Sequence, residues 1–267
     1  MSEGGAGMGD FTALFGIETK HMHTVSLLSG IDSTNSYLRR LSEVLPDGHL
    51  AVAGEQLSGR GRQGKSFFSP SDDGLYMSLL VKESKQVNDP LLTAKVSLAV
   101  CRAIDEVTGT NMTNGVGIKW VNDVYFGSKK LCGILCEKLT DLSGKPYVII
   151  GIGVNIYTDL LKYPKELRNV ACSLYDIMHK QCDKYKLCAF IVSELEKLLE
   201  SSDNDAVLKE YRARSIVLGH EIIVIRDNQK IRAAALDICD DGALLVRYED
   251  GFTSKLCGGE ISIRVKK

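Results

Sequence analysis

The sequence lacks the features that mark several large functional classes. Its 267 residues carry a formal net charge of −1, so no overall field draws the chain onto nucleic acid or an anionic membrane surface. No window approaches the roughly 20 apolar residues of a membrane span, and the first 20 residues lack the cationic and apolar regions of a secretory signal. We therefore expect a cytoplasmic protein with neither a nucleic-acid nor a membrane partner.

Patterns of catalytic or metal-binding cysteine are missing as well. The chain has eight cysteines, but none forms a C-x-x-C pair or a zinc-type spacing. We expect all eight to be reduced and structural, as in a reducing compartment. No G-x-S-x-G motif occurs, and the five histidines lie outside the motifs described below. A covalent enzyme intermediate is therefore not indicated.

The length and composition predict a globular chain with one large and one small domain. Hydrophobic residues make up 44% and charged residues 25%, which is ordinary for such a protein. Residues 1–20 are rich in glycine and are expected to be a flexible extension. Apolar strands and amphipathic helices predict an α+β domain over 21–214. After Arg214, about five short runs separated by DNQ, DDG, EDG and GG predict an SH3-like β-barrel over 215–267.

Local signals place several elements of the larger domain. A helix follows "SGIDS", with Asp32 or Ser33 as its N-cap. A second helix has Asp89 as its cap, Pro90 in its first turn and Gly109 as its end. The runs "VGIKWVNDVYF", "LCGILCEKL" and "PYVIIGIGVNI" are separated by turn residues, and they predict three strands of an antiparallel meander.

The stretch "GEQLSGRGRQGKSFFSP" concentrates positive charge in a glycine-rich loop. Such a loop suits a phosphate, because guanidinium groups bind it in a bidentate manner and backbone amides complete the contact. Its part Gly59–Ser66 matches the G-x-x-x-x-G-K-[ST] spacing, but a strand follows it where a P-loop would open a helix. A solvated basic hairpin is the alternative. The residues concerned are Gly59, Gly61, Gly64, Arg60, Arg62 and Lys65.

Two further clusters lie on the predicted meander. In "KWVNDVYFGSKKLCGIL", a hairpin brings an amide, a carboxylate and an ammonium group together from Asn122, Asp123 and Lys130. A surface salt bridge between the two strands is the alternative interpretation. In "GIGVN", the small residues at the end of a buried strand let a ligand lie against the backbone.

Taken in order, "STN", "GRGRQG", "KWVND", "KKLCGIL", "GIGVN" and "GGEISIR" resemble the biotin protein ligase (holocarboxylase synthetase) family from about residue 25 to the C-terminus. The resemblance implies a class II synthetase-like mixed sheet with helices and a C-terminal SH3-like barrel. It also implies the activity: biotin and ATP, with Mg²⁺, form biotinyl-5′-AMP and release pyrophosphate. Biotin then passes to a lysine on the biotin carrier domain of a carboxylase.

The resemblance assigns roles to matching positions. The biotin site would comprise Ser33, Thr34, Asn35, Gln56, Arg60, Gly61, Arg62, Lys130, Gly151 and Gly153, the first four of them at the ureido end. The ATP site would comprise Arg60, Arg62, Lys65, Phe67, Lys119, Asn122, Asp123, Asn155 and Arg264. The catalytic set would be Lys130, Arg60, Arg62 and Asp123, with Asp123 also a ligand of Mg²⁺. For "STN", helix capping and ligand binding are compatible roles.

The chain departs from the family pattern at two points. Val121 stands where the family usually has proline, and a β-branched residue there favours an extended backbone. Phe67 or Phe68 stands for a tryptophan that often follows the loop. Only about thirty residues precede Ser33, so we expect no winged helix–turn–helix and no repressor role. A lipoate– or octanoate–protein ligase of the same fold and a non-catalytic biotin- or carboxylase-binding module are the rival functions; a homodimer is left open.

Overall fold

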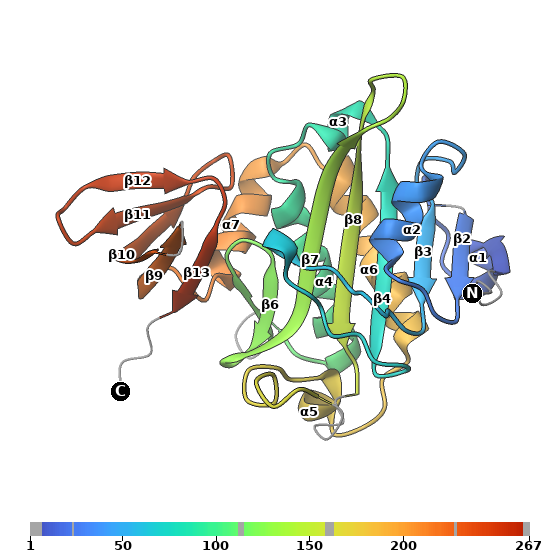
Figure 1. Ribbon diagram of the computed structural model, residues 1–267, viewed down its shortest axis with the longest axis horizontal. Coiled ribbons are helices and arrows are strands. Elements are labelled where there is room, and N and C mark those ends of the chain that lie inside the picture. The colour runs from blue at the N-terminus through green and yellow to red at the C-terminus, as the bar shows by residue number, and fades with distance from the viewer. Residues whose placement is uncertain (1–6, 23, 112–114, 158–162, 227–228, 264–267) are drawn as a thin grey trace.

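The computed structural model describes residues 7–22, 24–111, 115–157, 163–226 and 229–263. In this part of the chain the strands form a large and a small sheet (Figure 1). The large sheet comprises β1 (Gly7–Asp10), β2 (Thr24–Leu28), β3 (Leu50–Ala53), β4 (Gly74–Val81), β5 (Gly117–Lys119), β6 (Asp123–Phe126), β7 (Lys129–Thr140) and β8 (Pro146–Asn155). The small sheet comprises β9 (Glu221–Arg226), β10 (Gln229–Ile238), β11 (Leu244–Tyr248), β12 (Thr253–Leu256) and β13 (Glu260–Ile263).

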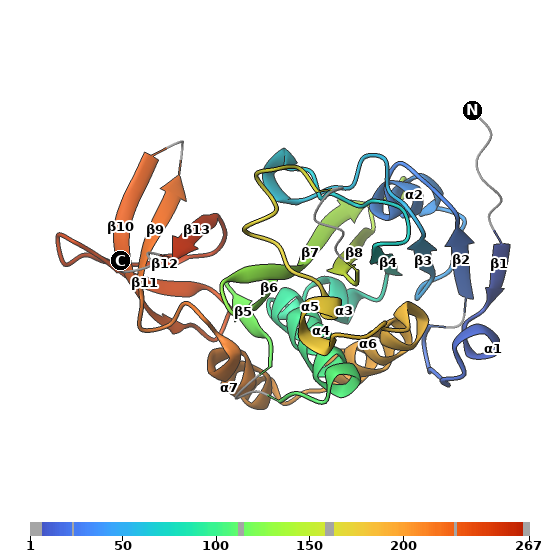
Figure 2. The ribbon, with the colours of Figure 1, turned by 90° about the horizontal axis from the view of Figure 1, so that it is seen from below.

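The helices accompany the large sheet. They are α1 (Phe11–Phe15), α2 (Thr34–Leu41), α3 (Ser84–Val87), α4 (Leu92–Thr108), α5 (Leu174–Met178), α6 (Lys184–Glu200) and α7 (Asn204–Arg214), with one 3₁₀ turn, η1 (Arg62–Gly64). Figure 2 shows α4 and α6 on one face of the sheet and α2 on the opposite face. None of the helices in the described ranges combines the length and apolar character needed to cross a membrane.

The large sheet is mixed, with the order β1-β2-β3-β4-β8-β7-β6-β5. Only β2 and β3 pair in parallel among these described strands. The run from β5 to β8 is an antiparallel meander, which confirms that prediction. The small sheet is antiparallel and five-stranded, in the order β12-β11-β10-β9-β13, and the predicted α+β class with a C-terminal β unit is confirmed.

Strand alternation separates the two faces of the large sheet, because successive side chains point to opposite sides. On β8, Ile150 and Ile152 join the main core with α4 and α6. Ile149 belongs to a second, smaller core beneath α2. Gly151 and Gly153 continue the register of Ile149, so the α2 face of the sheet has no side chain at these two positions. This gap in the surface of the sheet is where a ligand can approach the backbone.

Hydrogen bonds from the larger unit to backbone carbonyls join it to the small sheet. The indole Nε1 of Trp120 donates a hydrogen bond to the carbonyl oxygen of Gly242 over 3.0 Å. On α7, Arg212 Nε donates to the carbonyl oxygen of Ile238, also over 3.0 Å. Because Trp120 is almost fully buried, its N–H needs such a partner. The turn that carries Trp120 is therefore fixed against the C-terminal sheet.

The expectation of a flexible segment over residues 1–20 is wrong for residues 7–20. Strand β1 pairs with β2, and Asp10 caps α1 by accepting a hydrogen bond from the Ala13 amide over 2.9 Å. Phe11 is fully buried in the main core, and burying one phenylalanine contributes about 1.5–3 kcal/mol to folding. The glycine-rich composition of this segment gave no indication in the sequence that Phe11 would be buried. Residues 1–6 lie outside the described residues.

Two predicted boundaries also need correction. The stretch "VGIKWVNDVYF" forms two short strands, β5 and β6, with a turn over 120–122 where an extended backbone was expected around Val121; the Trp120–Val121 peptide is cis. The long helix begins at Leu92, with Leu91 and not the predicted Asp89 at its N-cap, although Asp89 still accepts a hydrogen bond from the Leu91 amide over 2.8 Å. Gly109 ends this helix in a left-handed conformation, as predicted.

Candidate active site

A cavity of about 290 Å³ lies on the α2 face of the large sheet, above β7 and β8. Its walls come from the N-terminus of α2, the loop between β3 and β4, the β5–β6 turn and the start of β7. Of the predicted site residues, the cavity is lined by Ser33, Thr34, Asn35, Gln56, Arg60, Gly61, Arg62, Lys65, Phe67, Lys119, Asn122, Asp123, Lys130, Gly151 and Gly153. Residues far apart in the sequence therefore meet in one place.

The floor of the cavity depends on glycines. Gly133 on β7 pairs with Gly153 on β8, and both face the cavity. A Cβ atom at Gly153 would lie 2.5 Å from the Phe67 ring, which is closer than a real carbon contact permits. A Cβ atom at Gly151 would lie 2.2 Å from Asn35 Oδ1. Larger residues at either position would displace a side chain of the site.

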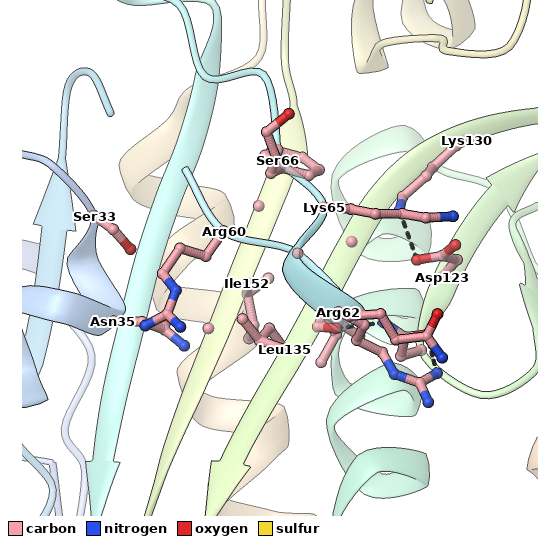
Figure 3. A pocket seen from close by; sticks show the side chains of 18 of the residues that line it. Ser33, Asn35, Arg60, Arg62, Lys65, Ser66, Asp123, Lys130, Leu135 and Ile152 are labelled. Atoms are coloured by element: carbon pink, nitrogen blue, oxygen red, sulfur yellow. Dashed lines mark hydrogen bonds and ion pairs between the residues drawn. The ribbon is translucent and has the colours of Figure 1, made fainter. Parts of the chain in front are cut away.

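One end of the cavity, which we call the polar end, consists of Ser33, Thr34, Asn35 and Gln56. Gln56 Oε1 accepts hydrogen bonds from the Thr34 amide and hydroxyl over 2.9 and 3.1 Å. Ser78 Oγ, beneath them on β4, donates to Asn35 Oδ1 over 2.6 Å. Ser33 is the N-cap of α2, yet its side chain makes no capping hydrogen bond. The hydroxyl of Ser33 points toward the cavity in Figure 3, and the hydrogen bonds hold its neighbours in place.

The glycine–arginine loop covers the cavity. It folds back on itself, since the Gly61 amide donates to the Lys65 carbonyl over 2.7 Å and Phe67 donates to the Gly59 carbonyl over 2.8 Å. The chain then runs into β4, which is antiparallel to β3. The P-loop interpretation of the Gly59–Ser66 spacing fails for that reason, as the strand context predicted. Arg62 Nη1 donates to Asn122 Oδ1 over 3.1 Å, so this loop contacts the β5–β6 turn.

The β6–β7 hairpin brings together the predicted amide, carboxylate and ammonium groups. Lys130 Nζ lies 2.7 Å from Asp123 Oδ1 (Figure 3) and 5.9 Å from the centre of the Phe67 ring. Asn122 Nδ2 donates to the Ile134 carbonyl over 2.5 Å. The Lys130 and Asp123 side chains are 33% and 22% exposed, and both residues line the cavity, so this ion pair lies in the cavity wall.

Positively charged side chains predominate in the walls of the cavity. Among the described residues that line the cavity, the cations are Arg60, Arg62, Lys65, Lys119 and Lys130, and the single carboxylate is Asp123. Several cations close to one another attract anionic ligands and offset the repulsion between two of them. The chain as a whole carries a net charge of −1, so the positive charge is local to the site.

One predicted residue of the described ranges, Asn155, is not part of this cavity wall. Asn155 is buried, and its Nδ2 donates to the Cys172 carbonyl over 2.9 Å, which makes it a brace between β8 and the segment after it. Arg264 lies outside the described residues. Sequence reasoning missed Gly259 and Ile261 of the C-terminal unit, which reach the cavity. Only "GGEISIR" in the family resemblance hinted at them.

Three thiols of the larger unit, Cys101, Cys132 and Cys136, are not activated as nucleophiles. All eight cysteines stand free, and burial raises the pKa of Cys136 to about 11 and that of Cys101 to about 12. Burial also raises the pKa of Cys132, which lies on β7 beside the site. A thiol with a raised pKa is protonated near neutrality and is a poor nucleophile. Chemistry at this site therefore rests on positioned charge.

The fold and the site define an enzyme cavity suited to anionic reactants, and comparison with known proteins identifies the class. Residues 27–155 match the biotin/lipoate A/B protein ligase family, and residues 217–264 match the biotin protein ligase C-terminal domain. The two matches together span more than half of the chain. The chain belongs to the biotin protein ligase family, as its motifs predicted.

Individual relatives agree with this assignment. The bifunctional ligase/repressor BirA of Escherichia coli is 28% identical over 244 residues, covering 90% of this chain and 74% of that protein. The biotin–[acetyl-CoA-carboxylase] ligase of Mycobacterium tuberculosis is 29% identical over 222 residues, covering 79% of each. The structure of the Aquifex aeolicus biotin protein ligase in complex with biotin and ATP superposes with a TM-score of 0.77 at 27% identity, covering 91% of this chain and 99% of that one.

Proposed function

We propose that this chain joins biotin to ATP and then transfers the biotinyl group to a lysine of a biotin carrier domain. In the first step a carboxylate oxygen of biotin bonds to the α-phosphorus of ATP, and the bond from that phosphorus to the bridging oxygen breaks to release pyrophosphate. In the second step the lysine amine bonds to the acyl carbon, AMP leaves and the amine loses a proton. The observation that carries the proposal is the cavity itself, in which five cations surround a glycine floor.

Each part of the cavity has a separate proposed role in binding or catalysis. The polar end offers hydrogen-bond donors and acceptors of the kind that a ureido group requires. Arg60, Arg62 and Lys65 on the loop lie over the cavity, where phosphate oxygens would gather. Lys130 would donate to the carboxylate oxygen as it attacks, and Phe67, close to the glycine floor, offers a ring face to the adenine. We propose residues 21–214 as the catalytic domain and 215–267 as a C-terminal domain that completes the wall.

The residues present fit Mg²⁺ only together with the nucleotide. No group of three or more carboxylate, histidine or cysteine side chains is arranged for a metal in the described ranges. Mg²⁺ is commonly held by one or two carboxylates and by substrate phosphates, and Asp123 supplies one such carboxylate. When bound, Mg²⁺ would neutralise phosphate charge. Asp123 would hold it, whereas the cations of the loop would orient the phosphates.

Asp123 has a second candidate role, as the group that accepts the proton of the acceptor lysine. The variant Asp123→Asn, given preformed biotinyl-AMP, separates the two roles. A normal transfer step would exclude the role as a base and leave the metal role. A slow transfer step at saturating carrier domain would assign the base.

One incubation tests the proposed function. The purified protein is mixed with labelled biotin, ATP, Mg²⁺ and a biotin carrier domain, and label on the carrier is measured by mass spectrometry. A carrier domain with its acceptor lysine replaced by arginine is the matched control. Lipoate and octanoate are offered in parallel, since the family model covers ligases of lipoate as well. Transfer of lipoate in preference to biotin would contradict the proposal.

The proposal also includes the cellular compartment and the partners of the protein. The protein would act in the cytoplasm on carrier domains of carboxylases, without nucleic acid or membrane as a partner. Light scattering of the purified chain, with and without biotin and ATP, would measure whether it forms a homodimer.

A further inference from the structure

We propose that Glu137 is a positioning residue that fixes Asn35 and Arg60 at the polar end of the cavity. The inference rests on the proposed function and deepens it. Glu137 lies on β7, and its two carboxylate oxygens have different partners. Its Oε2 accepts a hydrogen bond from Asn35 Nδ2 over 2.8 Å, and its Oε1 lies 3.4 Å from Arg60 Nη2.

The register of β7 explains how Glu137 reaches both partners. Gly133, Leu135 and Glu137 alternate along the strand and therefore share a face. Gly133 and Leu135 line the cavity, and Glu137 is the next residue on that face, paired across the sheet with Ile149. The carboxylate thus lies next to the cavity wall, where one side chain from α2 and one from the glycine–arginine loop reach β7.

The carboxylate determines which way the Asn35 amide faces. An ionised carboxylate only accepts hydrogen bonds, whereas an amide has one accepting and one donating end. Asn35 must therefore turn its NH₂ group to Glu137, which leaves Oδ1 to accept from Ser78 Oγ. A ligand at the polar end meets this one orientation of the amide. Without the carboxylate, both orientations of Asn35 become accessible.

The other oxygen of Glu137 anchors the loop. The Arg60 side chain extends toward Asn35 in Figure 3, and it is 41% exposed whereas the Glu137 side chain is 18% exposed. A guanidinium group has five N–H donors, so one contact with Glu137 leaves others to bind a ligand. Glu137 therefore holds Arg60 over the cavity and keeps it available to the ligand.

The variant Glu137→Gln tests both contacts with little change in volume. The glutamine oxygen can accept from Asn35, but its NH₂ group then faces the Arg60 guanidinium, where no acceptor remains. Since the loss of a partly exposed ion pair such as Arg60–Glu137 changes an equilibrium constant by up to about fivefold, we expect KM for biotin to rise about three- to fivefold. We expect kcat for adenylate formation to change less than about twofold, because Glu137 does not reach the reacting atoms.

The matched control is Glu249→Gln, in the turn after β11. Glu249 also pairs with an arginine, Arg232, over 3.3 Å, but both side chains are exposed and neither residue lines the cavity. Its variant should have the KM for biotin of the unmodified protein. Melting temperatures of both variants identify any loss of fold, and if Glu137→Gln does not fold, Glu137→Met is measured in the same way.

A double-mutant cycle with Arg60→Ala separates positioning from a general structural effect. If Glu137 acts through Arg60, the change Glu137→Gln should raise KM for biotin by a smaller factor in the Arg60→Ala background. Equal factors in both backgrounds, or a KM unchanged or lowered by Glu137→Gln alone, would overturn the proposal. Absence of adenylate with the unmodified protein would instead refute the proposed function, and equilibrium dialysis with biotin would still test Glu137.

Discussion

Replacing Lys130 by alanine should slow formation of the adenylate about 10²–10³-fold, equivalent to about 2.7–4 kcal/mol of barrier, because it removes one donor aimed at the reacting oxygen. The fold should be affected far less. Lys130 pairs with Asp123 over 2.7 Å, but both side chains are partly exposed. Such a pair contributes about 0–1 kcal/mol to the free energy of unfolding. A change of that size shifts the melting temperature of a chain this long by about 2–4 °C at most.

The assay follows pyrophosphate release with saturating biotin, ATP and Mg²⁺, with calorimetry on the same samples. Lys129→Ala is the control, since Lys129 is the neighbouring lysine on β7 but is exposed and does not line the cavity. The control should retain the full rate. A rate for Lys130→Ala within about threefold of the unmodified protein would remove Lys130 from the chemical step. An equal loss in both variants would mean that general positive charge, and not an aimed donor, is required.

Three further outcomes follow from the structure. Arg60→Ala should release free biotinyl-AMP, because the loop lines the cavity and would shield a bound adenylate from water. Non-specific biotinylation of added albumin measures the release, and no increase would contradict the prediction. Gly151→Ala should raise KM for biotin, since its Cβ would lie 2.2 Å from Asn35 Oδ1 and displace that side chain. An unchanged KM would show that biotin binding does not depend on the position of Asn35. His49 is buried, which lowers its pKa below the usual 6.5. Its folded form therefore binds fewer protons than the unfolded chain, and the free energy of unfolding should fall by up to about 1.4 kcal/mol per pH unit as the pH drops below about 6.5. Urea titrations of the unmodified protein and of His49→Gln at pH 7.5 and 5.5 test this, and identical pH dependence in both would refute it.

The fold could be predicted wherever a local signal was strong. The β-meander and the C-terminal strands are punctuated by turn residues, and Gly109 ends α4 as expected. The N-terminal segment was wrongly predicted to be flexible because of its glycine content. Its order depends on the burial of Phe11, which involves distant parts of the chain. The turn over 120–122 was also not apparent, because the β-forming residues of "GIKWV" and "VYF" on either side of "ND" suggested one continuous strand.

The site was predictable in its composition but not in its connections. The loop cations and the β6–β7 hairpin stand out in the sequence because polar groups cluster between apolar runs. Glu137 does not stand out, since its role arises from a contact with Asn35 that spans 102 positions. Asn155 shows the converse: the "GIGVN" motif drew attention to it, yet its amide binds the Cys172 carbonyl. Such pairings depend on how a helix or a loop packs against the sheet, and a single sequence does not contain that information.

These connections matter because the charges of the site are divided between a strand and a loop. Lys130 is on a strand of the sheet, so the sheet fixes its position. Arg60 and Arg62 are on a loop whose internal hydrogen bonds are short-range, and each needs an anchor outside the loop. Glu137 anchors the first over 3.4 Å, and Asn122 anchors the second over 3.1 Å. Because a cation lowers the repulsion between two anions only while it stays close to them, the loop can assist catalysis only to the extent that these two anchors hold it over the cavity.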